Sequence, residues 1–321
     1  MKPAMHHSQF FLWLKKISLT AFFSALIICA TYAYASAKKT SDSSQSPTNS
    51  LLIYTPIANT SITDSEFKSL DEKDFIYLAV AANFKSTLQQ LVNAFALEYP
   101  NIEKKQLKII SGATGALYAQ IIQGAPFDIF FAADTKRPQL LIKKHHAKKD
   151  SYYNYAYGQL AFAFQAREKE LCKNGIDSQN VLIEFINSYQ PSSKPTLAIA
   201  NPAIAPYGLS ANRLIKQSEK AFSQYRIVKG KNVLHAQQLL LNNNADLAIL
   251  SAAQSTHAAM ENYDFCLINK SLYTPIEQAM VIIKQAQRTD TQEYLLGQFF
   301  DFIKQESAQS IILSNGYLIN E

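Results

Sequence analysis

Four segments of the sequence place small, amide or hydroxyl residues directly after an apolar run and directly before a helical pattern. In the turn SGATG, from Ser111 to Gly115, two of the chain's nine glycines serve one sharp bend. Backbone N–H groups at the start of a helix have no intrahelical acceptor and favour a bound anion. The turn therefore predicts either an anion site or an ordinary helix cap.

Neutral hydrogen-bond donors are common to all four segments. The other three are Asn83, the Asn201–Gly208 stretch NPAIAPYG and the Gly230–Val233 stretch GKNV. Together the segments offer the hydroxyls of Ser111, Thr114 and Tyr207, whereas their only basic side chain, Lys231, can extend into water. Neutral donors at helix starts suit a desolvated oxyanion held by many hydrogen bonds. Four ordinary helix caps are the alternative interpretation.

Strand-like and helical patterns alternate from Asp74 to the end of the chain. FIYLAVAA (Phe75 to Ala82) predicts a buried strand, and Asn83 is then the expected N-cap of a helix. The further expected strands are LKII, FDIFFA, GQLAFAF, TLAIA, YRIV, DLAIL and AMVII. Helical patterns follow the Ser111 turn and Tyr207, and others start at Asp134, Asn232 and Asp290. This alternation predicts an α/β fold with mostly parallel sheets, in which ligands bind beyond the carboxyl ends of the strands.

The amino terminus has the order of a secretory signal. Lys15 and Lys16 precede an apolar run from Ile17 to Ala30, and small residues follow up to Ala37. We expect residues 1–37 to be a cleaved signal peptide and residues 38–73, rich in Ser, Thr and Asp, to be a flexible leader. The run is shorter than the roughly 20 residues of a membrane span, and an uncleaved anchor is the alternative.

Charge and cysteine content limit the partners and the compartment. The formal charge of +6 falls to +3 once the three lysines of the signal leave, which is too little to indicate nucleic-acid binding. Cys29 follows the bulky Ile28 and is not expected to be lipidated. Cys172 and Cys266 remain, and they could form a disulfide in an oxidising compartment. The sequence leaves open whether they meet.

Catalytic signatures are missing from the sequence. It contains no G-x-S-x-G elbow, no H-E-x-x-H, no C-x-x-C and no phosphate-binding loop. His235 and His257 stand apart from any nucleophile pattern, and a surface or packing role is the simpler interpretation. A binding protein is therefore favoured over an enzyme.

The order of several motifs resembles that of the periplasmic molybdate-binding proteins of ABC transporters. The motifs are VAANF, SGATGALYAQIIQGAPFDIFFAAD, NPAIAPYG, NADLAILSAAQ and LYTPIEQAMVII. The resemblance runs from about Phe75 to the carboxyl terminus, so that only the signal and the leader lie outside it.

This resemblance implies a two-lobe periplasmic binding protein fold of the type II kind, with a hinge between the lobes. Lobe 1 would comprise residues 74–157 and 275–321, and lobe 2 residues 158–274. The protein would be a periplasmic monomer that captures molybdate or tungstate and delivers it to an ABC membrane permease. It would need no cofactor and no metal site, because the metal arrives within the oxyanion. Alternatives are another tetrahedral oxyanion such as sulfate and, remotely, a hydrolytic enzyme on the same fold.

The resemblance also implies which residues contact the anion. In lobe 1 these are Asn83, with Ala82 offering only backbone, and Thr114 in the hydroxyl position of the glycine-rich turn, flanked by Ala113 and Ser111.

In lobe 2 the resemblance implies contacts from Tyr207 and from the backbone N–H of Val233. Ser251 stands where some family members have a tyrosine, which puts that contact in doubt and would leave Tyr207 as the sole phenol at the site.

Overall fold

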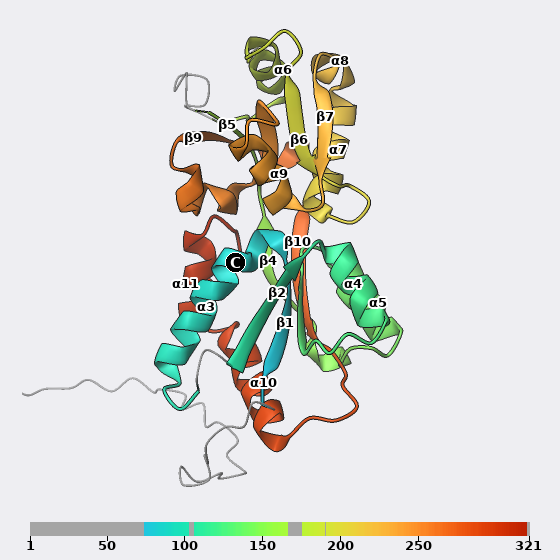
Figure 1. The fold of residues 1–321 in the computed structure, drawn as a ribbon, viewed down its shortest axis with the longest axis vertical. Helices are drawn as coiled ribbons and strands as arrows, with labels where there is room; N and C mark the ends of the chain where they lie inside the picture. The colour runs from blue at the N-terminus through green and yellow to red at the C-terminus, as the bar shows by residue number, and fades with distance from the viewer. Residues whose placement is uncertain (1–73, 103–105, 166–174, 190, 320–321) are drawn as a thin grey trace, which may run out of the picture. The chain divides into compact units, whose positions relative to one another are not determined.

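The computed structural model of the chain describes residues 74–102, 106–165, 175–189 and 191–319. These residues form two five-stranded sheets, each with helices on both faces (Figure 1). The expected α/β fold is confirmed. The predicted signal peptide (1–37) and leader (38–73) lie outside the described residues.

The first sheet has the strand order β2-β1-β3-β10-β4. Its strands are β1 (Ile76–Ala81), β2 (Leu107–Gly112), β3 (Ile129–Ala132), β4 (Tyr153–Gly158) and β10 (Ile276–Ile282). Strand β1 runs parallel to β2 and β3, whereas β10 runs antiparallel to β3 and β4. The sheet is therefore mixed, and the carboxyl ends of its three parallel strands meet at one edge.

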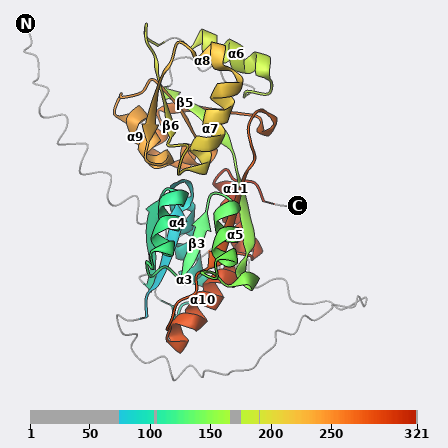
Figure 2. The same cartoon turned by 90° about the vertical axis from the view of Figure 1, so that its right-hand side faces the viewer.

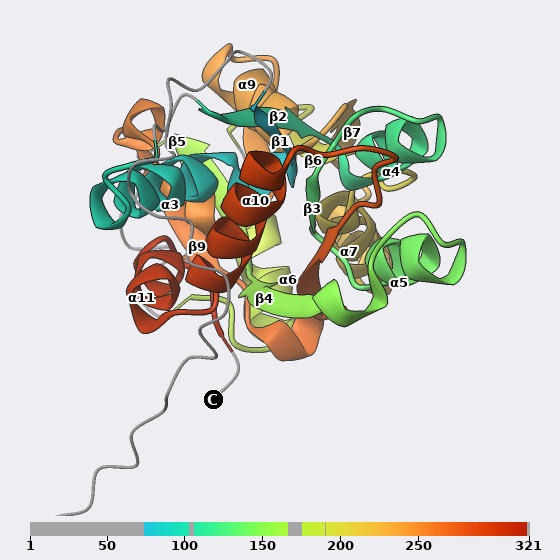
Figure 3. The ribbon, with the colours of Figure 1, turned by 90° about the horizontal axis from the view of Figure 1, so that it is seen from below.

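Helices cover this sheet because its buried side chains alternate between two apolar clusters. On one face lie α3 (Lys85–Glu98), α10 (Asp290–Phe302) and α11 (Glu306–Ser314), which pack on β1 through aromatic residues such as Phe95 and Phe299. On the other face lie α4 (Thr114–Ile122) and α5 (Lys136–Lys143), through Leu117 and Leu141 (Figure 3).

The second sheet repeats this arrangement, with the strand order β7-β6-β8-β5-β9. Its strands are β5 (Leu160–Gln165), β6 (Thr196–Ala200), β7 (Arg226–Gly230), β8 (Leu247–Ser251) and β9 (Tyr263–Leu267). Strand β6 runs parallel to β7 and β8, and β5 runs antiparallel to β8 and β9. Helices α6 (Gln179–Ser188), α7 (Pro206–Gln217) and α8 (Glu219–Phe222) pack on one face and α9 (Val233–Leu241) on the other (Figure 2).

The chain passes between the two sheets twice. Residues 158–160 lead from β4 to β5, and residues 268–275 lead from β9 back to β10. The strands of the two sheets thus fall within the two predicted lobes, whose boundaries and hinge stay a prediction. Within the described residues, no helix combines the length and the apolar character that crossing a membrane requires.

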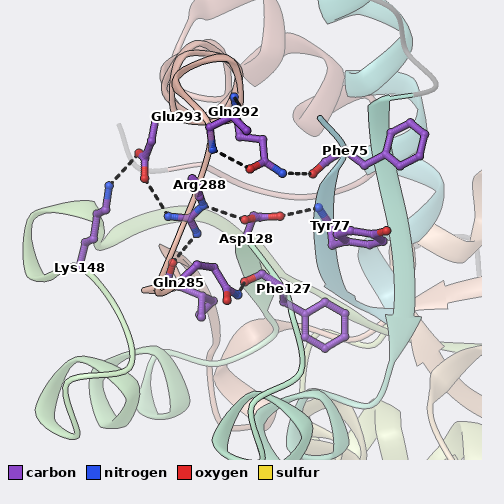
Figure 4. A network of polar contacts seen from close by, with 11 residues as sticks. Phe75, Tyr77, Phe127, Asp128, Lys148, Gln285, Arg288, Gln292 and Glu293 are labelled. Carbon is purple, nitrogen blue, oxygen red and sulfur yellow. Dashed lines mark hydrogen bonds and ion pairs between the residues drawn. The ribbon is translucent and has the colours of Figure 1, made fainter. Parts of the chain in front are cut away.

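A buried ion pair fastens the amino-terminal end of the first sheet (Figure 4). The Arg288 Nε–H donates to Asp128 Oδ1 over 2.8 Å, and the two side chains are only 4% and 7% exposed. Asp128 also accepts the backbone N–H of Tyr77, at the start of β1, and Arg288 donates to the Ile283 carbonyl and to Glu293. The guanidinium therefore joins β1, β3, β10 and α10 at the end of the sheet opposite the carboxyl ends of its parallel strands.

Cys266, buried on β9, is disulfide-bonded. Cys172 lies outside the described residues, and its pairing with Cys266 stays a prediction.

Candidate functional site

A small pocket lies where the carboxyl ends of β1, β2 and β3 meet the helix starts of the second sheet. A water-sized sphere can move within only about 10 Å³ of it, which is about the least room that holds one water molecule. The lining residues are Ala81, Ala82, Asn83, Gly112, Ala113, Thr114, Ala133, Ala205, Pro206, Tyr207, Asn232 and Val233. None of them carries a charged side chain, so the pocket can recognise a small ligand only through neutral donors and dipoles.

Four helix starts converge on this pocket. The pairs that line it are Ala82–Asn83 of the 3₁₀ helix η2 (Ala82–Phe84) before α3, Ala113–Thr114 of α4, Pro206–Tyr207 of α7 and Asn232–Val233 of α9. The first N–H groups of a helix lack an intrahelical acceptor, and the helix dipole places partial positive charge there. Two helix starts from each sheet therefore direct positive potential into one small space, which favours an anion.

Thr114 and Tyr207 supply hydroxyl groups from opposite sides. Thr114 Oγ1 accepts the backbone N–H of Ala133 over 3.2 Å, so the hydroxyl hydrogen remains for a ligand. Tyr207 Oη accepts the hydroxyl of Ser251 over 3.1 Å, which likewise leaves the phenol hydrogen to donate. Both side chains are almost fully buried, so neither competes with much water for its partner.

Burial raises the pKa of Tyr207 well above its ordinary value, and the neighbouring phenol of Tyr317 adds to the rise. Hydrogen-bonding groups of Ser251 and Gln278 lower the pKa by a smaller amount. The phenol is thus neutral at physiological pH and acts as a hydrogen-bond donor, as an anion site requires.

Asn83 lies in the pocket, but its side chain does not cap a helix, so that expectation was wrong. Helix α3 begins at Lys85 without a side-chain cap. Instead, Asn83 Nδ2 donates to Gln278 Oε1 over 2.7 Å and to Tyr317 Oη over 3.2 Å. Both amide hydrogens are engaged, because these two buried acceptors outcompete the local backbone. Asn83 can therefore donate to a ligand through its backbone N–H.

The remaining predicted residues separate into two groups. Ala82, Ala113 and Val233 line the pocket. Ser111 does not; it lies within β2, opposite Val80, one residue before the end of the strand. Ser251, at the end of β8, is absent from the lining as well and instead supports the Tyr207 hydroxyl from behind.

Six lining residues were not among the sequence-based candidates: Ala81, Gly112, Ala133, Ala205, Pro206 and Asn232. Ala205 and Asn232 are the N-cap residues of α7 and α9, and Ala133 directly follows β3. The stretches SGATG, NPAIAPYG and GKNV, singled out in the sequence, already contain Gly112, Ala205, Pro206 and Asn232. Ala133 could have been found by the rule that ligands meet strand ends.

The start of α9 is fixed by a second layer of amides. Asn232, where the helix was expected to start, is its N-cap, and its Oδ1 accepts the N–H of His235 over 3.0 Å. Behind it, Gln254 Nε2 donates to the Val233 carbonyl over 3.2 Å and to Gln237 Oε1 over 2.7 Å. The Val233 N–H is therefore held in place facing the pocket.

Gly115 allows the start of α4, on the first sheet, to contact the segment before α7, on the second sheet. The backbone N–H of Gly115, in the first turn of α4, donates to the Ile204 carbonyl before α7 over 2.8 Å. A Cβ at position 115 would lie 3.0 Å from that oxygen and 2.9 Å from an Arg137 guanidinium nitrogen. Close backbone approach explains this glycine, whereas an anion contact does not, because its N–H is already used.

Known proteins resemble this chain in sequence and in fold. Residues 76–318 match the sequence family described as bacterial extracellular solute-binding protein. The chain is 28% identical to the molybdate-binding protein ModA of Azotobacter vinelandii over 75% of its own length and 89% of the relative's. It is 27% identical to ModA of Rhodobacter capsulatus over 76% and 88% of the two lengths. The solved periplasmic molybdate-binding protein of Azotobacter vinelandii superposes with a TM-score of 0.63 at 30% identity, covering 77% of this chain and 100% of that one.

Proposed function

Because the chain belongs to the bacterial extracellular solute-binding proteins, we propose that it captures molybdate, or tungstate, and delivers it to an ABC permease. The observation that carries this proposal is the pocket in which four helix starts and two free hydroxyl hydrogens meet without a charged side chain. Such a site suits a small, fully desolvated oxyanion that is held by hydrogen bonds alone. Relatives at 27–28% identity that are named molybdate-binding proteins support the choice of ligand.

The same proposal includes where and how the protein acts. It would be exported by the signal at residues 1–37, work as a periplasmic monomer and hand its ligand to the membrane partner. No step of this cycle breaks or forms a covalent bond, so the protein is a binding protein and not an enzyme.

Calorimetric titration of the mature protein with molybdate, tungstate, sulfate and phosphate tests the ligand. We expect molybdate and tungstate to bind with similar affinity, since the two anions offer nearly the same size and charge to the same donors. Sulfate should bind at least about tenfold more weakly, which is about 1.4 kcal/mol, because a smaller anion cannot reach donors on both sides. Tightest binding of sulfate would instead favour the alternative oxyanion, and the lack of heat with all four would refute the proposal.

The pH dependence of binding follows from the donors. Tyr207 is the only titratable residue in the lining, and its pKa is raised, so its donating neutral form persists to higher pH than for an exposed tyrosine. The affinity for molybdate should therefore change by less than about twofold between about pH 6 and pH 9. Titrations across this range check the expectation. A steep loss near neutral pH would indicate a histidine or an amine as the real ligand.

A further inference from the structure

Gln278 is a buried glutamine directly behind the pocket, outside its lining. It lies on β10 opposite Ala156, at a shift in the pairing register between Gln278 and Ala279. Such irregularities re-aim a side chain and are common next to functional sites. The Gln278 side chain is fully buried, so each of its polar atoms needs a partner within the protein.

Among the described residues, only the oxygen of the Gln278 amide has hydrogen-bond partners. Gln278 Oε1 accepts Asn83 Nδ2 over 2.7 Å and the hydroxyl of Tyr155 over 3.3 Å. Its Nε2 has no hydrogen-bond partner among the described residues. An orphan buried donor is costly, and this one lies within the layer that supports the anion site.

The unpartnered nitrogen lies near Tyr207. A Cβ on Gly158 would lie 2.0 Å from Tyr207 Oη and 3.2 Å from Gln278 Nε2, so the phenol and the amide meet in the space that this glycine leaves open. The Gln278 amide also lowers the pKa of Tyr207, against the larger effect of burial. The amide is thus near enough to the phenol to lower its pKa as a hydrogen-bonding group, although no contact between the two meets the geometric limits of a hydrogen bond.

We propose that Gln278 is a positioning residue that couples the two halves of the site and completes a hydrogen bond to Tyr207 when the oxyanion binds. This inference rests on the proposed function. Ser251 already occupies one lone pair of the Tyr207 oxygen. When an N–H of Gln278 donates to the other lone pair, the phenol hydrogen of Tyr207 can point only into the pocket. Gln278 Oε1 also accepts the side-chain amide of Asn83, which belongs to the first sheet, whereas Tyr207 belongs to the second. A ligand contact at Tyr207 and one at Asn83 therefore strengthen each other through Gln278.

The Gln278→Glu variant tests this coupling, because it keeps the size of the side chain and the acceptor for Asn83. Its ionised carboxylate would accept the Tyr207 hydrogen and repel the anion, so molybdate should bind at least tenfold more weakly at about pH 8. Protonation of the buried carboxyl restores a neutral donor. Affinity should therefore recover severalfold toward about pH 5.5, whereas the parent protein stays constant. A variant that binds like the parent at both values would overturn the inference.

Two controls separate coupling from general damage. Gln106→Glu places the same change at a buried glutamine before β2, at the far end of that strand from the pocket, and should leave the pH profile of binding flat. Gln278→Met should weaken binding less in Tyr207→Phe than in the parent, because the part of its action that passes through that hydroxyl is then already lost. Fully multiplicative effects would contradict a role through Tyr207.

A ligand-free measurement keeps this test independent of the proposed function. The NMR signal of the ring-labelled Tyr207, assigned by its loss in Tyr207→Phe, should shift in Gln278→Met and stay in place in Gln106→Met. If the parent binds no molybdate while this signal shifts, the proposed function fails although Gln278 does act on Tyr207. If the signal stays unchanged in Gln278→Met, the coupling fails.

Discussion

Replacing Arg288 by leucine should lower the free energy of unfolding by about 3–5 kcal/mol, because it leaves the buried Asp128 carboxylate without its cation. The two side chains are 4% and 7% exposed and lie 2.8 Å apart, so water can compensate little. For a domain of this size, the loss corresponds to a melting temperature lower by roughly 6–20 °C. Urea and thermal unfolding of the mature protein measure the change.

A matched control is available at the surface. Lys304 pairs with Asp301 on one helix end, with side chains 39% and 72% exposed, so Lys304→Met should cost less than about 1 kcal/mol. Removing both partners of the buried pair, in Arg288→Leu with Asp128→Leu, should recover at least about 1 kcal/mol relative to Arg288→Leu alone, since no charge is then left unpaired. An Arg288→Leu protein as stable as the parent would show that the pair contributes nothing.

The ion pair and the pocket lie at opposite ends of the same strands. Asp128 directly precedes β3, whereas Ala133 in the pocket lining directly follows it. Buried residues of β3 join the two ends, and they pack on helices from both faces. We therefore expect Arg288→Leu to change stability while the folded fraction keeps its affinity for the ligand.

Local sequence patterns were sufficient for the elements that depend on local physics. TLAIA is β6 (Thr196–Ala200), and the helix predicted from Asp290 is α10. Asn232 caps α9 because its side chain reaches the N–H of His235, three residues on. Strands β4 and β9, and helices α6, α8 and α11, were not identified from the sequence. Strand β4 (YNYAYG) has tyrosine at every second position, a strand pattern that could have identified it, and its place is fixed by pairing with β10, far along the chain.

The candidate site, too, was predictable only where it depends on the local sequence. Strand ends and helix starts located Thr114, Tyr207 and Val233, which the structure brings together. The direction of a side chain was not predictable where its hydrogen-bond partners lie far away in the sequence. Asn83 turns toward Gln278 and Tyr317, 195 and 234 residues away, and Ser251 supports Tyr207 across 44 residues. No local pattern encodes these contacts, so the supporting layer is visible only in three dimensions.

Removing the hydroxyls of Thr114 and Tyr207 should produce the largest loss of binding. A hydrogen bond to a charged group contributes about 1.5–3 kcal/mol. Thr114→Val and Tyr207→Phe should therefore each weaken molybdate binding by about 10- to 100-fold. The two residues donate from helix starts on different sheets, and the double variant should lose more than either single one. Calorimetric titration of each variant gives the affinities.

Each substitution also disturbs a supporting bond, so stability must be measured alongside affinity. Thr114→Val leaves the buried N–H of Ala133 without its acceptor, and Tyr207→Phe does the same to the Ser251 hydroxyl. Thr114→Ser retains the oxygen and should keep both the melting temperature and most of the affinity. Val233→Ala should bind nearly like the parent, because only its backbone N–H faces the ligand. If Val233→Ala loses binding while Thr114→Val and Tyr207→Phe both retain it, the anion does not occupy this pocket as proposed.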